Sequence, residues 1–182
     1  MIEHAAHPKS DSPKSDSLCE LLRYWTERLR GRAIPSRADI DPIELRSMLG
    51  YLTILEVVPP AAPGAPPQFR YRLHGVHVTR AMGCDMTGKF VSDLPSKPYA
   101  DEVTERLLRV VAERRPVVST SQWSTGERTT QYEIIWLPLS SDDVHIDRLL
   151  GGVAILGGVD RHLAVQRDRN RRLAATMDQL ST

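Results

Sequence analysis

A glycine that interrupts an alternating run is the sequence feature that most constrains this chain. In residues 69–74, apolar and aromatic side chains alternate with basic ones, which is the period-two pattern of a strand with two different faces. Gly75 then breaks the strand, and residues 76–82 can form about two helical turns before Gly83 ends them. We therefore expect residues 69–94 to form the wall and lid of a pocket.

Two longer segments have the spacing of amphipathic helices. Residues 17–30 begin with a capping-box pattern and carry a strong apolar stripe, and a second stripe follows Pro98 until Pro116 stops it. The first stripe must pack on its own domain or on a second copy of the chain, and the sequence leaves both open. The residues expected at a dimer interface are Leu18, Leu22, Trp25 and Leu29.

Four further segments have the composition of strands. Residues 51–58 are apolar on both faces and predict a central strand. Residues 117–124 and 129–137 predict a long hairpin. Residues 149–156 predict the last strand, in which two adjacent glycines would allow another backbone to approach closely.

The remaining segments are read as connections and extensions. Asp41 as an N-cap, with Pro42 after it, predicts a short helix that ends at Gly50. The proline- and alanine-rich residues 59–67 predict a loop. We expect a disordered leader (residues 1–16), one domain (17–158) and a C-terminal helical extension that is rich in arginine (159–182).

Composition and charge exclude several classes of function. The net charge of +1 disfavours broad electrostatic capture of nucleic acid or of an anionic membrane. No run reaches the roughly 18 apolar residues of a membrane span, and no signal peptide opens the chain, so we expect a cytoplasmic protein. Cys19 and Cys84 are far apart and lack the paired spacing of a zinc or redox site.

The predicted order of elements is an α+β arrangement: a five-stranded antiparallel sheet with helices inserted after its second strand. This order resembles the PAS fold. Three landmarks resemble those of a bacterial family of short, stand-alone PAS proteins: Pro-Ser-Arg-Ala-Asp-Ile-Asp-Pro at residues 35–42, Tyr-Arg-Leu-His-Gly at 71–75 and Gly-Cys-Asp-Met-Thr-Gly at 83–88. The resemblance implies signalling through protein contacts, a leading helix that dimerises, and a cavity between the sheet and the inserted helices. The cavity residues that it implies are Leu73, Val76, Met82, Met86, Trp123, Tyr132, Ile134 and Trp136.

The two histidines that flank Gly75, His74 and His77, suggest metal or haem binding, because imidazole is a good ligand for both. The resemblance argues against haem, since haem-binding PAS domains carry their axial histidine on the longer helix, which here contains none. It also argues against flavin photochemistry, because Cys84 lacks the asparagine-cysteine-arginine setting. We therefore predict no metal, and we disfavour haem and flavin.

Arg70, Arg72 and His74 share one face of the alternating run and could contact an anion. The alternative is that the arginines pair with acids nearby. The C-terminal arginines are interrupted by acidic residues, which makes nucleic-acid binding unfavourable. No glycine-flanked serine, phosphate-binding loop or metal-binding helix motif is present, so we predict no catalytic residue.

Taken together, the sequence predicts a non-catalytic PAS-type sensor or adaptor module in bacterial signal transduction. It would act by binding a small molecule or a signalling protein and by forming a homodimer. The alternative is a small-molecule carrier or an enzyme built on a similar curved sheet. The ligand cannot be named from these residues.

Overall fold

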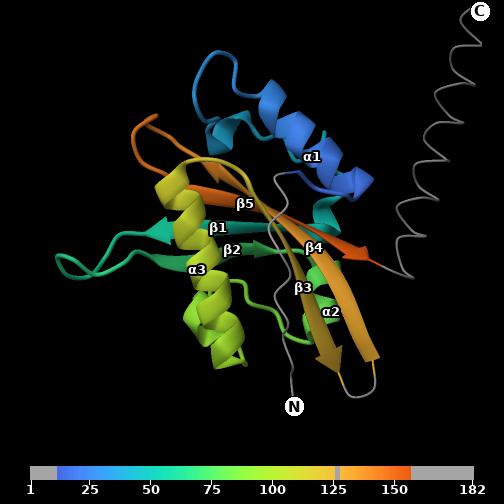
Figure 1. The fold of residues 1–182 in the computed structure, drawn as a ribbon. Helices are drawn as coiled ribbons and strands as arrows, with labels where there is room; N and C mark the ends of the chain where they lie inside the picture. The colour runs from blue at the N-terminus through green and yellow to red at the C-terminus, as the bar shows by residue number, and fades with distance from the viewer. Residues whose placement is uncertain (1–11, 126–127, 157–182) are drawn as a thin grey trace, which may run out of the picture.

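The computed structural model describes residues 12–125 and 128–156. This part of the chain forms three α-helices and five strands, which are labelled in Figure 1. The helices are α1 (Asp16–Glu27), α2 (Val76–Met82) and α3 (Lys97–Glu113). The strands are β1 (Leu52–Val58), β2 (Gln68–His74), β3 (Val117–Thr125), β4 (Arg128–Leu139) and β5 (Arg148–Leu156). The predicted C-terminal helix and most of the predicted leader lie outside the described residues.

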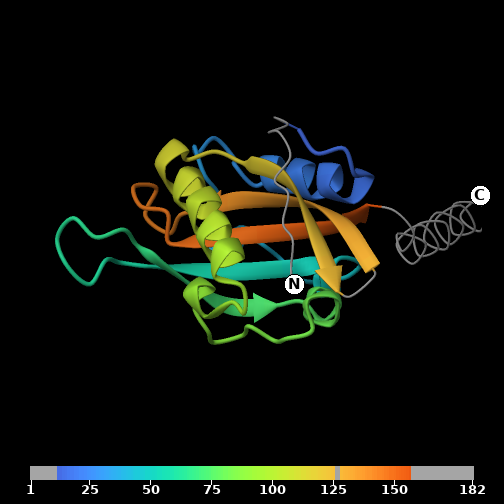
Figure 2. The same ribbon diagram turned by 60° about the horizontal axis from the view of Figure 1, so that its bottom comes forward.

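The strands form one antiparallel sheet in the order β2-β1-β5-β4-β3, with α2 and α3 inserted after β2. The predicted α+β, PAS-like fold is confirmed. β1 pairs with both β2 and β5, which confirms its prediction as a central strand. The nine-residue connection from β1 to β2 is the proline-rich loop, and it projects beyond the sheet in Figure 2.

Each face of the sheet is covered by different helices (Figures 1 and 2). We call the face toward α2 and α3 the inner face and the face toward α1 the outer face. β5 shows the alternation: a Cβ at Gly151 would lie 2.4 Å from the Trp136 ring on the inner face, and one at Gly152 would lie 2.4 Å from Leu21 of α1 on the outer face. Side chains therefore make the close approach to these glycines. The prediction that another backbone would approach them was wrong.

A β-bulge in the β1–β2 pairing changes which side chains of β2 reach the inner face. Tyr71 lies opposite Leu55, but the register then shifts, so that Leu73 lies opposite Ile54 and His74 lies opposite Thr53. A bulge inserts one extra residue and inverts the alternation beyond it. As a result His74 is on the inner face with Tyr71, and Leu73 is not.

Gly75 then places α2 against the sheet. Its N–H donates to the carbonyl of Leu52 at 2.9 Å, and a Cβ at this position would lie 2.4 Å from the carbonyl oxygen of Gly50. Only glycine permits this approach. The predicted limits of the short helix are confirmed, with Gly83 in the left-handed conformation (φ +75°) at its C-terminus.

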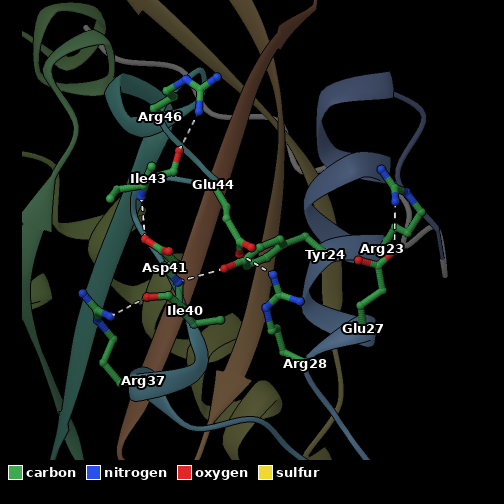
Figure 3. Close-up of polar contacts among 10 residues, drawn as sticks. All are labelled: Arg23, Tyr24, Glu27, Arg28, Arg37, Ile40, Asp41, Ile43, Glu44 and Arg46. Carbon is green, nitrogen blue, oxygen red and sulfur yellow. Dashed lines mark hydrogen bonds and ion pairs between the residues drawn. The ribbon is translucent and has the colours of Figure 1, made fainter. Parts of the chain in front are cut away.

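The predicted short helix after Asp41 is wrong: residues 42–48 form turns, followed by a 3-10 helix at Leu49–Tyr51. The Asp41 carboxylate accepts the N–H of Ile43 at 2.8 Å and closes a turn, while its own N–H donates to the Tyr24 hydroxyl of α1 at 2.8 Å. Figure 3 shows this contact beside the Arg28–Glu44 ion pair. The connection is thus held by α1 and by turn hydrogen bonds of its own, such as that from the Met48 N–H to the Leu45 carbonyl at 2.9 Å.

Candidate ligand cavity

An inner cavity lies between the inner face of the sheet, α2 and α3. It consists of two adjoining hollows, which we call the Gln122 hollow, toward His77 and Gln122, and the Arg106 hollow, toward Thr53 and Arg106. Their volumes are about 40 and 30 Å³, counted as space open to the centre of a water molecule. About 10–15 Å³ of such space holds one water, so each hollow has room for a few waters. Both hollows are lined by Val78, Met82, Tyr99, Ile134 and Val153.

The cavity wall carries one arginine, and its charge is balanced. Arg106 of α3 forms an ion pair with Glu102 and donates from Nη1 to the Ser121 hydroxyl of β3 at 3.1 Å. The two charged side chains are 13% and 21% exposed. Because Glu102 already compensates the guanidinium, a second negative charge here would be placed beside a carboxylate in a poorly solvated site. The arrangement therefore favours an uncharged molecule.

Two tyrosines of the wall are neutral at all physiological pH values. Burial raises the pKa of Tyr99 to about 12. It also raises the pKa of Tyr71 well above its ordinary value of 10. Neither phenol is thus a candidate base, and both present aromatic surface to the cavity.

The two histidines beside Gly75 have different surroundings. His74 is buried, with Nδ1 3.0 Å from the Thr79 hydroxyl, and burial lowers its pKa, an effect that nearby Asp85 partly offsets. His77 is half-buried, and its ring centroid lies 4.5 Å from that of Tyr51. In the part of the chain that the structure describes, no group of three or more His, Cys, Asp or Glu side chains could hold a metal ion.

The structure places the predicted cavity residues in three kinds of position. Met82, Tyr132 and Ile134 line the Gln122 hollow, and Trp136 lines the Arg106 hollow. Three others line neither hollow: Val76 is 52% exposed on α2, Met86 is buried in the core, and Leu73 is half-buried. The side chain of Trp123 lies outside the described residues.

The three residues proposed for an anion contact do not converge. Arg70 donates from Nε to Glu56 at 2.8 Å, and Arg72 lies 3.9 Å from the same carboxylate, whereas His74 is buried on the inner face. Arg148 of β5 also approaches Glu56, at 3.6 Å. The hydrogen bond from Arg70 lowers the pKa of Glu56 and keeps it charged. The arginines therefore pair with an acid nearby, which was the alternative reading.

The leading helix packs on its own sheet. Leu18 is fully buried and Trp25 is 5% exposed, with its indole N–H donating to the Pro138 carbonyl at 2.9 Å. Leu22 and Leu29 are half-buried at the edge of the same core. Two of the four residues expected at a dimer interface are thus taken up within the chain, and dimerisation itself stays a prediction.

Several wall residues were not among those expected. Tyr99 begins the apolar stripe of α3, and Val153 follows the two glycines of β5. The helical period of α3 could have indicated Tyr99. Val153 could not have been assigned, because the face it occupies depends on its pairing with Ile134. Ser121 carries no apolar signal and is identified only in the folded chain, by its place in the cavity wall and its contact with Arg106.

A curved antiparallel sheet that closes a cavity with inserted helices defines the PAS class of sensor folds. The sequence model of the PAS domain family matches residues 13–154, so this chain belongs to that family. No curated protein matches the sequence. No helix in the described part is both long and apolar enough to cross a bilayer.

Among solved structures, the PAS domain of Bordetella pertussis BvgS is 17% identical, with a TM-score of 0.47 over 73% of this chain and 99% of that one. An RNA-binding light-oxygen-voltage receptor is 14% identical, with a TM-score of 0.43 over 98% of this chain and 44% of that one. At these values the assignment rests on the family match alone.

Proposed function

We propose that this chain is a non-catalytic sensor or adaptor module of bacterial signal transduction, and that its inner cavity binds a small, uncharged, largely apolar molecule. PAS domains are generally sensor modules without catalytic activity. The observation that carries the proposal is the balanced wall of the cavity, in which the Arg106–Glu102 pair is surrounded by apolar and aromatic side chains.

Binding would act through α2. The hollows hold only a few waters each, so a larger ligand requires α2 to move outward from the sheet. A ligand shifts such an equilibrium only by its difference in affinity for the two states, and a tenfold preference corresponds to about 1.4 kcal/mol. That shift is large enough to change a weak contact with a signalling partner or within the proposed homodimer.

The binding part of the proposal can be tested with two probes of similar size. Phenol is neutral, whereas benzoate carries a negative charge. We expect phenol to raise the melting temperature in a saturable manner and benzoate to have at least tenfold weaker affinity, because benzoate would face Glu102 beside Arg106. Isothermal titration calorimetry measures both affinities, and native mass spectrometry of freshly purified protein reports oligomer mass and any retained molecule.

Two matched substitutions locate the site. Val153→Phe fills the inner cavity and should abolish phenol binding, while Val76→Phe adds the same ring on the exposed side of α2 and should leave binding unchanged. If phenol does not bind the native protein and no molecule is retained on purification, ligand sensing is contradicted. An adaptor that acts through protein contacts would then be favoured.

A further inference from the structure

A buried carboxylate holds the start of the leading helix on the sheet. Glu133 of β4 is 1% exposed. Its Oε1 accepts the backbone N–H of Lys14 and its Oε2 accepts that of Ser15, both at 2.7 Å. Ser15 is the N-cap of α1, so the carboxylate also lies at the positive end of the helix dipole. We call these two hydrogen bonds the Glu133 latch.

The latch stands directly behind the cavity wall. On β4, Tyr132 and Ile134 point inward and line the cavity, and Glu133 between them points to the outer face, opposite Ala154. Successive side chains of a strand move with one backbone. A ligand that shifts the β4 backbone at Tyr132 or Ile134 would therefore also shift the Glu133 carboxylate relative to α1.

The segment that the latch holds is tied together by its own hydrogen bonds. The Ser15 carbonyl accepts the N–H of Cys19 at 2.9 Å, and the Ser15 and Ser17 hydroxyls are hydrogen-bonded at 2.9 Å. The thiol of Cys19 also donates to the carbonyl of Pro13 at 3.2 Å. Residues 13–19 are thus tied to the first turn of α1, and loss of the latch frees that turn together with the residues before it.

The carboxylate of the latch depends on these two donors. Within the described residues, Glu133 bonds to backbone N–H groups, and no lysine or arginine forms an ion pair with it. A buried carboxylate that loses both donors is strongly disfavoured and must be hydrated. Because Glu133 is 1% exposed, its hydration requires the structure around the latch to open. A movement of β4 that breaks both hydrogen bonds would therefore release the start of α1 from the sheet.

We propose that Glu133 couples the inner cavity to the leading helix, so that filling the cavity releases the first turn of α1. This inference rests on the proposed function, because the cavity is its input. Its output is a change in the accessibility of residues 12–19, which a partner protein or a second copy of the chain can recognise.

The latch is tested by hydrogen exchange in the full chain. Glu133→Gln replaces one acceptor oxygen by an N–H₂ group, and we expect the Lys14 and Ser15 amides to exchange about tenfold faster or more, since bonds to charged acceptors are the stronger ones. The matched control is Glu27→Gln, which makes the same change on the exposed side of α1, where Glu27 pairs with Arg23. The control should leave both amides unchanged.

Coupling is tested without any ligand. Val153→Phe fills the cavity opposite Ile134 and should also speed exchange at Lys14 and Ser15, by about threefold or more, and it should add nothing in the Glu133→Gln background. Val57→Phe, an equal enlargement of β1 away from the cavity, should have no such effect.

Three results would overturn the inference. Unchanged exchange in Glu133→Gln shows that the carboxylate does not hold the helix. If exchange is faster in Glu133→Gln but unchanged in Val153→Phe, Glu133 makes a structural contact that is not coupled to the cavity. Equal effects of Val57→Phe and Val153→Phe show general destabilisation. These readouts require no bound molecule, so a failure of phenol to bind would contradict the proposed ligand and leave the latch measurement intact.

Discussion

At the scale of single residues, the junction between β2 and α2 concentrates the strongest local constraints. Gly75 lies against the Gly50 carbonyl, and the position of a Cβ at Gly50 would be 2.3 Å from the His77 ring. His74 is buried on one side of this junction and hydrogen-bonded to Thr79. Movement of α2 must therefore change the surroundings of both imidazoles.

Burial of His74 predicts a pH dependence of stability. Its pKa is lowered in the folded state, so the unfolded chain takes up a proton first, near the ordinary value of 6.5. The free energy of unfolding should be highest above that pH and should fall as the pH decreases below it, by up to about 1.4 kcal/mol per pH unit. Urea denaturation between pH 7.5 and 5 measures the slope.

Two variants assign this slope to His74. His74→Gln removes the titrating group and should flatten the profile over this range. Thr79→Ala removes its hydrogen-bond partner but keeps the imidazole buried, so the slope should remain. Equal slopes in the native protein and His74→Gln would show that other groups cause the pH dependence.

At the scale of elements, α1 is anchored at both ends. The Glu133 latch holds its start, and the indole of Trp25 donates to the Pro138 carbonyl near its end. Tyr24, on the neighbouring position of the helix, instead holds the connection by accepting the Asp41 N–H. The adjacent residues Tyr24 and Trp25 thus make hydrogen bonds to two different parts of the chain.

The two aromatic anchors should differ in their contribution to stability. Trp25→Phe leaves a buried carbonyl without its donor and should lower the free energy of unfolding by about 1–3 kcal/mol. Tyr24→Phe frees the N–H of Asp41, an exposed residue that can bind water, and should cost less than about 1 kcal/mol. Chemical denaturation measures both values, and an equal cost would contradict the buried hydrogen bond at Trp25.

At the scale of the whole molecule, the two faces of the sheet have separate roles. The inner face carries the cavity with α2 and α3, and the outer face carries α1 and the Glu133 latch. Successive side chains of each strand lie on opposite faces of the sheet, so a shift of a strand would change the contacts on both faces. The connections between elements contribute unequally to the stability of this arrangement.

Two deletions of equal length should therefore have opposite outcomes. Residues 61–64 are exposed in the proline-rich loop, and their deletion should change the melting temperature by only a few degrees, because loop length has a weak effect. Deletion of residues 84–87 removes buried Met86 and displaces Gly88, whose N–H donates to the Tyr71 carbonyl, and it should prevent folding. Circular dichroism on heating distinguishes the two, and a similar loss in both would contradict this assignment.

Much of the fold could be predicted because its elements carry local signals. Gly83 ends α2 by its left-handed backbone conformation, and the apolar stripes of α1 and α3 follow from helical periodicity. Gly75 is required instead by its close approach to the Gly50 carbonyl. The prediction of a short helix after Asp41 was wrong because the Asp41 side chain, which could cap a helix, can also close a turn. The contact with Tyr24 favours the turn.

The composition of the cavity depended on information that is not local. Tyr132, Ile134 and Trp136 alternate along one strand and share a face wherever that strand lies. Leu73 and His74 exchanged faces because a bulge forms where β2 pairs with β1, and no residue of β2 alone encodes that shift.

The sequence by itself determined the order of strands and helices along the chain, the end of α2 at Gly83 and the apolar faces, because each depends on residues close together in the chain. Only the tertiary structure decided that α1 covers its own sheet and that Glu133 holds its first turn. That contact joins residues 118 positions apart, and the free energy of a buried carboxylate depends on donors that only the folded chain brings to it.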